Sequence, residues 1–503
     1  MEKQMKKIIA LILVLVMCLP LAACKKSVDT TPTPTPGGDA PAVSLEKVRY
    51  EVPAGGYDGS AVTIQFSHTM GEELRGVLDQ YIKEFNKIYP NITIEHAQVG
   101  SYDDVRDTVN KQLTAGNQPN IAYCYPDHVA LYNLTGKVVP LDNFIESTIP
   151  DTLGGGVLGL TQTEINNFID AYYAEGTVFD AAGTMYTLPM SKSTEVLYYN
   201  KTFFDANGLT PPTTWAELEA VSAQIMEITK DYANASVSYP FGYDSESNWF
   251  ITMTEQYGSD YTKNDAQKFY FNNETNRGFV KMFREWYAKG YFTTQELYGA
   301  YTSGLFTNTD PTKGSVYMCI GSSAGAKNQV PTEVDGAAPF EVGIAPLPQY
   351  DANNKKSISQ GPSLCIFDSE NKQEVVASWL FVKFLATNAK FQAAFSMVSG
   401  YIPVIEKDIL IEALPTYGTW LETGIAPGAT KATAKSKAIA DTIKVALSQA
   451  DTYYTSPAFN GSSKARDQVG ELMKECFTTP TDNVDQLIAD AFKKALAECV
   501  ADA

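Results

Sequence analysis

Residues 62–96 read VTIQFSHTMGEELRGVLDQYIKEFNKIYPNITIEH and contain the first complete structural unit of the chain. Val62–Phe66 alternates apolar and polar residues, which predicts a half-buried strand, and Ile92–His96 repeats the pattern. Between them, Glu72–Ile88 has apolar residues at helical spacing, and Pro90 follows as a helix stop. A strand, a helix and a second strand in this order predict a βαβ unit with parallel strands.

The rest of the chain continues to alternate between the two kinds of pattern. Further strands are expected at Ile121–Tyr125, Thr187–Met190, Glu195–Tyr199, Ser315–Ile320, Glu341–Ala345 and Ser363–Phe367. Further helices are expected at Asp103–Ala115, Trp215–Thr229, Asn276–Lys289, Lys372–Ala386, Ala389–Val398, Ala465–Phe477 and Val484–Val500. Interleaved helices and strands predict an α/β fold, and 503 residues are too many for one ordinary core, so we expect two or more lobes.

The N-terminal stretch has the pattern of an export signal. Ile8–Leu19 is an apolar run that follows three lysines and is too short to span a bilayer. Leu21-Ala22-Ala23-Cys24 then resembles a bacterial lipobox, which implies a signal peptide over residues 1–23 and lipidation of Cys24. The alternative is an ordinary signal peptide with a chance cysteine. We therefore expect a cell-membrane location, lipid-anchored on the extracellular face (the periplasmic side where there are two membranes).

Residues 24–44 are rich in Pro, Thr and Gly and predict a disordered tether between the lipidated cysteine and the folded body.

Composition excludes several classes of function. A net charge of −19 argues against a nucleic-acid partner, which requires a basic surface. Only three histidines are present, so we expect no metal site and no cofactor. Five cysteines remain after the signal and Cys24, without a CxxC pair, and the expected role is that of buried small hydrophobes. Whether Cys476 and Cys499 pair is left open.

Motifs for catalysis are mostly absent. Residues 321–325 read GSSAG and match G-x-S-x-G, but every histidine precedes Ser323, whereas an α/β-hydrolase places its histidine after the serine. The pair Asp103 and Asp104 is interpreted as charge complementation at a helix start. A carboxylate pair for glycoside hydrolysis needs no short spacing, so a secreted glycan-acting enzyme remains an alternative.

The aromatic residues indicate a sugar ligand. Tyr and Trp rings present an apolar face with a polar edge, which suits stacking against a sugar ring. Ligands of open α/β sheets bind beyond the carboxyl ends of strands. Aromatic residues at such positions are Tyr102, Tyr125, Tyr243, Trp249 and Tyr401.

Seven short blocks, in order, resemble family 1 extracellular solute-binding proteins. The blocks are FSHTMGEEL (66–74), FNKIYP (85–90), AGNQPNI (115–121), GKVVPL (136–141), LP with STEVLYYNK (188–189 and 193–201), PPTTW (211–215) and SGYIPV (399–404). The resemblance implies a two-lobed fold of the type II periplasmic-binding-protein kind, with a ligand cleft between the lobes. It also implies hinge closure around a solute, delivery to ABC transporter permease subunits, a monomeric state and no enzymatic activity. An adhesion or sensor module on the same fold is a further alternative.

The resemblance also implies where the chain crosses between lobes. Crossings are expected near Ser191–Thr194 and Ser359–Ser363. Lobe 1 would comprise residues 45–192 with 359–400, and lobe 2 would comprise residues 193–358 with 401–503.

Within the family the nearest resemblance is to members that bind glycerol phosphate or carbohydrate. A ligand glutamate of such members falls at Pro126, with Asp127 beside it as a substitute, and Arg466 resembles an arginine that contacts phosphate. The interpretation of Arg466 as a solvated helix residue stays open, and neutral oligosaccharide is the favoured solute. The full predicted ligand set is Glu73, Tyr102, Asp127, Ser193, Tyr243, Trp249, Ser322, Gly361, Tyr401 and Arg466.

Overall fold

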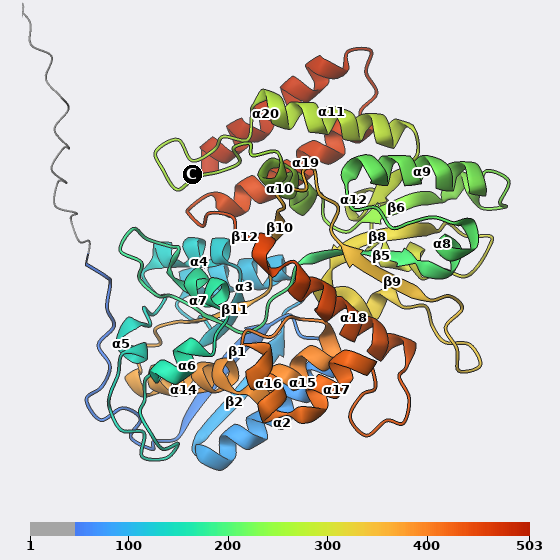
Figure 1. The fold of residues 1–503 in the computed structure, drawn as a ribbon. Coiled ribbons are helices and arrows are strands. Elements are labelled where there is room, and N and C mark those ends of the chain that lie inside the picture. The colour runs from blue at the N-terminus through green and yellow to red at the C-terminus, as the bar shows by residue number, and fades with distance from the viewer. Residues whose placement is uncertain (1–45, 503) are drawn as a thin grey trace, which may run out of the picture. The chain divides into compact units, whose positions relative to one another are not determined.

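A computed structural model describes residues 46–502 of the protein. The predicted signal peptide, the lipidation of Cys24 and the tether lie outside these residues. The described chain forms two five-stranded sheets with helices around them (Figure 1). Within this part of the chain, no helix combines the length and the apolar character needed to cross a bilayer.

The first sheet contains the two strands of the predicted βαβ unit. Its strands are ordered β2 (Ile92–Gln98), β1 (Val62–His68), β3 (Ile121–Cys124), β11 (Ser363–Ile366) and β4 (Leu188–Pro189). β1 pairs in parallel with β2 and β3, while β11 runs antiparallel to β3. Helix α2 (Glu72–Ile88) connects β1 to β2 and buries Leu74, Leu78, Tyr81 and Phe85, so the predicted unit is confirmed.

The second sheet collects the strands from the middle of the chain. The order is β7 (Phe292–Thr294), β6 (Tyr239–Tyr243), β8 (Val316–Ser322), β5 (Glu195–Asn200) and β9 (Val342–Pro346). β6, β7 and β8 are parallel, whereas β5 runs antiparallel to both of its neighbours. Two mixed sheets with helices between their strands confirm the α/β class.

Each sheet has its own set of covering helices. Around the first sheet lie α2, α3 (Tyr102–Ala115), α4 (Pro126–Tyr132), α5 (Asp142–Ile145), α6 (Gln162–Asn166), α7 (Asp170–Ala174), α14 (Lys372–Thr387) and α15 (Ala389–Ser399). Around the second lie α8 (Lys201–Asn207), α9 (Trp215–Thr229), α10 (Glu246–Gln256), α11 (Glu274–Ala288), α12 (Gln295–Tyr298), α13 (Ser303–Phe306), α19 (Ser462–Thr478) and α20 (Val484–Asp502).

The remaining helices come from the chain after residue 400. α16 (Lys407–Ala413), α17 (Pro415–Thr423) and α18 (Ala434–Ser448) contribute to a hydrophobic cluster that contains residues of both sheets, and α18 packs against β5 and β9. α19 and α20 pack into the cluster of the second sheet. The expected assignment of residues 401–503 to lobe 2 stays a prediction.

The two sheets are joined by chain segments that lie side by side. The link from β4 to β5 pairs with the link into β11, because Ser193 and Gln360 exchange two backbone hydrogen bonds of 2.8 Å. Lys192 exchanges a second pair with Ile402. Short strands β10 (Ser357–Ile358) and β12 (Tyr453–Tyr454) pair beside them.

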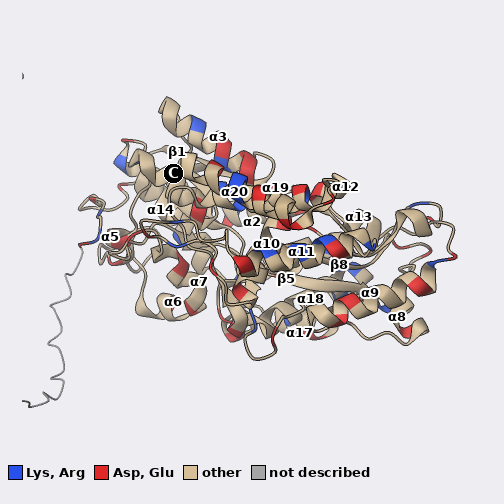
Figure 2. Ribbon diagram, turned by 90° about the horizontal axis from the view of Figure 1, so that it is seen from above, with Lys and Arg blue, Asp and Glu red and all other residues tan. Residues whose placement is uncertain are grey.

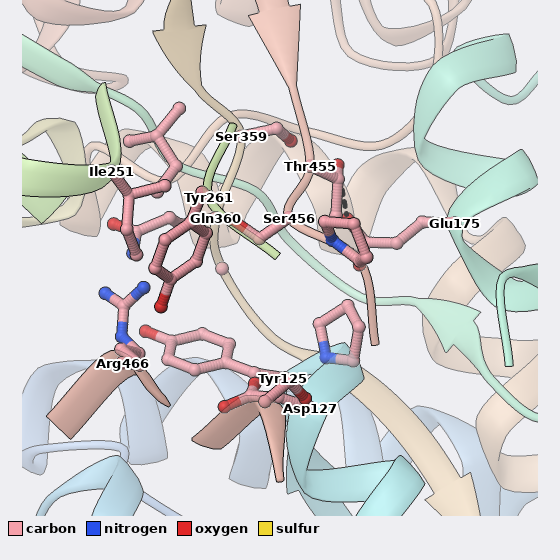
Figure 3. Close-up of a pocket in the computed structure, with 15 residues that line it drawn as sticks. Tyr125, Asp127, Glu175, Ile251, Tyr261, Ser359, Gln360, Thr455, Ser456 and Arg466 are labelled. Carbon is pink, nitrogen blue, oxygen red and sulfur yellow. Dashed lines mark hydrogen bonds between the residues drawn. The ribbon is translucent and has the colours of Figure 1, made fainter. Parts of the chain in front are cut away.

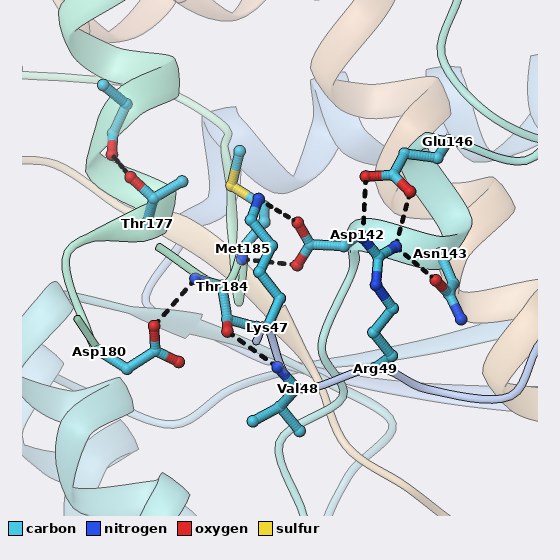
Figure 4. Close-up of polar contacts among 11 residues, drawn as sticks. Lys47, Val48, Arg49, Asp142, Asn143, Glu146, Thr177, Asp180, Thr184 and Met185 are labelled. Carbon is cyan, nitrogen blue, oxygen red and sulfur yellow. Dashed lines mark hydrogen bonds and ion pairs between the residues drawn. The ribbon is translucent and has the colours of Figure 1, made fainter. Parts of the chain in front are cut away.

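The first described residues are attached to the side of the first sheet. Lys47 forms an ion pair of 2.6 Å with Asp142 at the start of α5, and Arg49 donates to Glu146 just beyond it (Figure 4). The backbone N–H of Val48 donates to Thr184. These contacts hold residues 47–49 against the first lobe.

The cysteines and the charged residues are distributed differently. The five cysteines within residues 46–502 are buried, which confirms the expected environment of small hydrophobes. Acidic residues are spread over the helices around both sheets and are mixed with basic residues (Figure 2). No group of three or more potential metal-binding side chains occurs within residues 46–502.

Candidate functional site

A pocket opens where segments of both sheets meet. It contains about 530 Å³ of space between atoms, part of it open to solvent. It is lined by Tyr125, Pro126, Asp127, Glu175, Ile251, Tyr261, Ile358, Ser359, Gln360, Gly361, Thr455, Ser456, Pro457, Ser462 and Arg466 (Figure 3).

The fold explains why these residues meet. β3 ends at Cys124, and the chain turns at once into α4, so Tyr125 and Asp127 stand at the carboxyl end of a central strand. From the second lobe, α19 begins at Ser462 after Gly461, whose φ of 103° suits glycine, and brings Arg466 to the opposite wall. The linking segment around Gln360 forms a third wall.

Asp127 and Arg466 supply the pocket with opposite charges. The Oδ2 atom of Asp127 accepts a hydrogen bond of 2.7 Å from the Ser463 hydroxyl on α19, while Arg466 donates to Asn248. Burial would raise the pKa of Asp127, but His128, Arg466 and Ser463 outweigh it and lower that pKa below its ordinary value. The carboxylate is therefore ionised at neutral pH.

Two hydroxyl groups at this site lack a partner. The Tyr261 hydroxyl and the Ser456 hydroxyl are buried and make no hydrogen bond with the described residues. In Figure 3 the phenols of Tyr125 and Tyr261 point to the same space as the Arg466 guanidinium. Because buried polar groups are nearly always hydrogen-bonded, these atoms are suited to a bound polar molecule.

The second carboxylate of the pocket is already engaged. Glu175 forms an ion pair with Lys192, whose side chain is fully buried, and it also accepts from the Thr455 hydroxyl at 3.5 Å. Lys192 further donates to the Ser363 hydroxyl at 3.2 Å. Glu175 therefore contributes structure at the junction of the lobes, and Asp127 is the carboxylate available to a ligand.

Three tyrosines extend the site along the first lobe. The rings of Tyr102 and Tyr125 stack with centroids 4.3 Å apart, and the hydroxyls of Tyr102 and Tyr401 lie 2.8 Å apart. Burial raises the pKa of Tyr401 to about 12, so its phenol is neutral at physiological pH.

Half of the predicted ligand set gathers at this place. Asp127, Gly361 and Arg466 line the pocket, and Tyr102 and Tyr401 adjoin it through Tyr125. Ser193 is buried and pairs through its backbone with Gln360, a lining residue.

Gly361 has a different role from the one expected. Its φ is +98°, and a Cβ atom there would lie 2.6 Å from both the Cα of Lys192 and the carbonyl oxygen of Ser191. The glycine thus permits contact between the linking segments, whereas it was predicted as a ligand residue.

The other predicted ligand residues lie elsewhere. Glu73 forms two ion pairs of 2.8 Å, with Lys327 and with Lys435, on the surface. The Ser322 hydroxyl accepts from the backbone N–H of Ala324 and caps the turn after β8. Neither residue lines the pocket.

Tyr243 and Trp249 belong to the core of the second lobe. Both are fully buried, and their rings stack with centroids 4.9 Å apart. Trp249 also packs on Phe283 at 4.0 Å. The Trp249 ring is fully buried in this core, so it presents no exposed face on which a sugar could stack.

Several lining residues were not in the predicted ligand set. Tyr125 had a usable signal, because it is the last residue of a predicted strand and was named among the aromatic residues at strand ends. Tyr261, Thr455 and Ser456 lie between regular elements, where no periodic pattern marks them. The GSSAG segment is not part of the pocket, since Ser323 is buried and its hydroxyl accepts from the backbone N–H of Thr194.

Two α/β lobes with a polar pocket between them define a type II periplasmic binding protein. UgpB from Mycobacterium tuberculosis in complex with glycerophosphocholine has a similar fold, with a TM-score of 0.68 and 16% sequence identity over 88% of this chain and 99% of the other. MalE from Bdellovibrio bacteriovorus bound to maltotriose gives a TM-score of 0.64 and 16% identity, covering 88% of this chain and 100% of the other. The predicted fold is confirmed.

The sequence assigns the protein to a family. A family model described as bacterial extracellular solute-binding protein matches residues 80–415, and the chain belongs to this family. Among curated relatives, the sn-glycerol-3-phosphate-binding periplasmic protein UgpB of Shigella flexneri serotype 5b is 25% identical over 355 residues, 69% of this chain and 75% of the relative. The same protein of Escherichia coli K12 is 24% identical over 359 residues, with the same coverage.

Proposed function

We propose that this protein captures a carbohydrate or sugar-phosphate-like solute in the pocket, closes its lobes around it and delivers it to an ABC transporter permease. The supporting observation is the meeting of Arg466, Asp127 and the unpartnered hydroxyl of Tyr261 in one pocket between the lobes. A solute with many hydroxyl groups can both donate to the carboxylate and accept from the guanidinium.

The charge of the pocket favours a neutral solute. Arg466 carries one positive charge and Asp127 one negative charge, while Glu175 is neutralised by Lys192. A phosphate group would gain from Arg466 but would meet the Asp127 carboxylate on the facing side. We therefore favour a neutral oligosaccharide, for which Tyr125 and Tyr102 supply an aromatic surface.

A glycerol phosphate or phosphodiester is the second candidate. Arg466 can hold a phosphate through two parallel hydrogen bonds, and the curated relatives bind sn-glycerol 3-phosphate according to their names. The Asp127 carboxylate would accept a hydrogen bond from a neutral sugar but would repel a phosphate. A substitution at Asp127 therefore distinguishes the two candidates.

The location and partners follow the sequence motif. We propose that Cys24 carries the lipid, that the protein works as a monomer on the extracellular face of the cell membrane, and that the pocket does no chemistry. Replacing Cys24 by alanine is then expected to release the protein from the membrane fraction. Retention of Cys24→Ala in membranes would contradict the lipid anchor.

A binding screen tests the proposed function. Thermal unfolding of residues 45–503 is measured with maltotriose, glucose, sn-glycerol 3-phosphate and glycerophosphocholine. A solute that binds only the folded form adds about 2.7 kcal/mol of stability at a hundredfold excess over its Kd. We expect a shift with a saccharide, and recovery of the sugar intact; cleavage would favour a glycan-acting enzyme. No shift with any of the four would contradict the proposed solute class.

Asp127→Asn then separates the two candidates. The substitution keeps the shape of the side chain and removes its charge. For a neutral sugar we expect weaker binding, by about tenfold, since a charge-assisted hydrogen bond is lost. For a phosphate we expect unchanged or tighter binding, since a repulsive charge is removed. Arg466→Ala should weaken both.

A further inference from the structure

The buried carboxylate of Glu195, in the second lobe, is separated from the pocket residue Arg466 by one side chain, that of Asn248. Glu195 begins β5 directly after the segment that crosses from the first lobe, and it is 2% exposed. It does not line the pocket, and it has no lysine or arginine as a direct ion-pair partner among the described residues. Such a group requires strong hydrogen bonds to be kept in the interior.

Two side chains donate to this carboxylate. The Tyr243 hydroxyl donates to Oε2 of Glu195 at 2.5 Å, and Nδ2 of Asn248 donates to Oε1 at 2.9 Å. Tyr243 and Asn248 are themselves buried. The carboxylate is thereby joined to α10, on which Asn248 lies.

Asn248 connects Glu195 to the pocket. Its Oδ1 atom accepts a hydrogen bond from Arg466 and another, of 2.9 Å, from Nε2 of Gln360. Its Nδ2 atom also donates to Oε1 of Gln360 at 2.9 Å. Arg466 and Gln360 both line the pocket, so one amide fixes two of its polar walls.

The direction of the Asn248 amide follows from its partners. An ionised carboxylate only accepts hydrogen bonds, so Glu195 requires the NH₂ group of Asn248 to face it. The carbonyl oxygen of the amide must then face Arg466, which only donates. Protonation would turn Glu195 into a hydrogen-bond donor, and the Asn248 amide could then rotate so that its NH₂ group faces Arg466. Two donors would face each other in that arrangement, and the hydrogen bond from Arg466 to Asn248 would be lost.

We propose that Glu195 and Asn248 are positioning residues of the solute site, which hold the Arg466 guanidinium and the Gln360 amide toward the pocket. This inference rests on the proposed function, because it assigns these residues a role in solute binding. Neither residue needs to touch the solute.

Protonation of Glu195 gives the inference a measurable signature. Burial raises the pKa of Glu195 to about 7, against the effect of Tyr243, Asn248 and Arg466 and with a further rise from Asp244. The ionisable groups around it are Tyr243 on β6, Asp244 directly after β6, Arg466 on α19 and Tyr454 on β12. Solute affinity should therefore fall as pH decreases through about 7.

The binding test uses two variants and a matched control. Affinities for maltotriose and for sn-glycerol 3-phosphate are measured by calorimetry at about pH 6 and about pH 8, on either side of this pKa. Asn248→Ala should weaken binding by about tenfold or more, and Glu195→Gln should weaken it and remove the pH dependence. Asn276→Ala is the control: this buried amide of α11 donates to Phe271 and Asp260 and is not among the pocket residues. Circular dichroism confirms that each variant is folded.

The outcomes separate the inference from the proposed function. Wild-type affinity with an unchanged pH profile in Glu195→Gln and Asn248→Ala would overturn the positioning role and leave the proposed function intact. Failure of the wild type to bind either probe would contradict the solute class. For that case, crystal structures without solute give an independent result: Arg466 should leave the pocket wall in Asn248→Ala, and an unmoved Arg466 would overturn the inference.

Discussion

Gly361 is the residue at which the linking segments make their closest approach. Its positive φ is unfavourable for any side chain, and the space for a Cβ atom is filled by backbone of the neighbouring segment. Two independent physical causes, the positive φ and the filled space, therefore restrict position 361 to glycine.

Gly361→Ala should destabilise the protein strongly. Backbone strain alone costs about 1–3 kcal/mol, and displacement of the Lys192 backbone adds to it. Gly183→Ala is the matched control, because Gly183 also has a positive φ of +69° but has no atom within 4 Å of the added carbon. Free energies of unfolding from urea titration give the comparison. Equal losses for the two variants would contradict the role assigned to the close contact.

At the scale of single residues, only part of the candidate site could be predicted from the sequence. Asp127 was predicted from the family resemblance, because it lies beside Pro126, where such members have a ligand glutamate. Trp249 was misplaced because α10 is buried on nearly all sides, so its sequence has no polar face that would mark the tryptophan as core. Glu73 starts a helix beyond a strand, as ligand residues do, but its lysine partners lie more than 250 positions away in the sequence.

At the scale of elements, the linking segment around Lys192 contains the principal buried ion pair of the site. Lys192 is fully enclosed, and Glu175, Ser363 and the carbonyl oxygen of Gly361 surround its ammonium group. Removal of one charge leaves the other buried without compensation.

Lys192→Met should therefore cost about 3–5 kcal/mol of folding stability. The double variant Lys192→Met with Glu175→Leu replaces both charges by apolar groups and should recover much of this loss. Chemical denaturation of the wild type, the single variant and the double variant provides the measurement. A double variant that is as unstable as Lys192→Met alone would show that the charges are not the cause.

The elements themselves were largely predictable from sequence. Helix α2 begins and ends where the apolar periodicity predicted, and α9 has the predicted bounds, with Thr214 as its N-cap in a capping box with Glu217. The wall formed by Tyr261 and Ser456 was not predictable, because these residues lie outside regular elements and meet only through tertiary packing. The packing of α18 against β5 and β9 depends on the same kind of long-range contact.

At the scale of the whole folded body, contacts cross between the lobes on more than one side of the pocket. The Ser463 hydroxyl of α19 reaches Asp127 of α4. Glu73 of α2 reaches Lys327, which follows β8 of the second sheet. Any opening of the lobes under the proposed hinge motion would have to break these contacts.

The Glu73 contacts have a predictable pH dependence. Hydrogen bonds from Lys327 and then Lys435 lower the pKa of Glu73 to about 2, from an ordinary value of 4.5. Because the pKa of Glu73 is lower in the folded form, its ionised carboxylate stabilises the folded form at pH values above the ordinary pKa of 4.5. This contribution disappears as the pH falls from 4.5 toward about 2.

Glu73→Gln should thus lose stability at neutral pH and match the wild type near pH 2. The side chain is about half exposed, so the loss at neutral pH should be no more than about 1 kcal/mol. Glu84→Gln, which affects an exposed pair with Lys87 inside α2, is the control for a local surface charge. Urea titrations at several pH values give the difference, and a difference that does not change with pH would contradict the assigned ion pairs.

The central claim is that solute binds between the lobes at Arg466 and Asp127, and a crystal structure with bound solute tests it most directly. The crystal is grown with whichever probe gives the largest thermal shift. The account predicts solute within hydrogen-bonding distance of Arg466 and of the Tyr261 hydroxyl, which has no partner among the described residues. Solute bound elsewhere, for example in the groove lined by Phe340 and Ala438, with the pocket at Arg466 left empty, would contradict it.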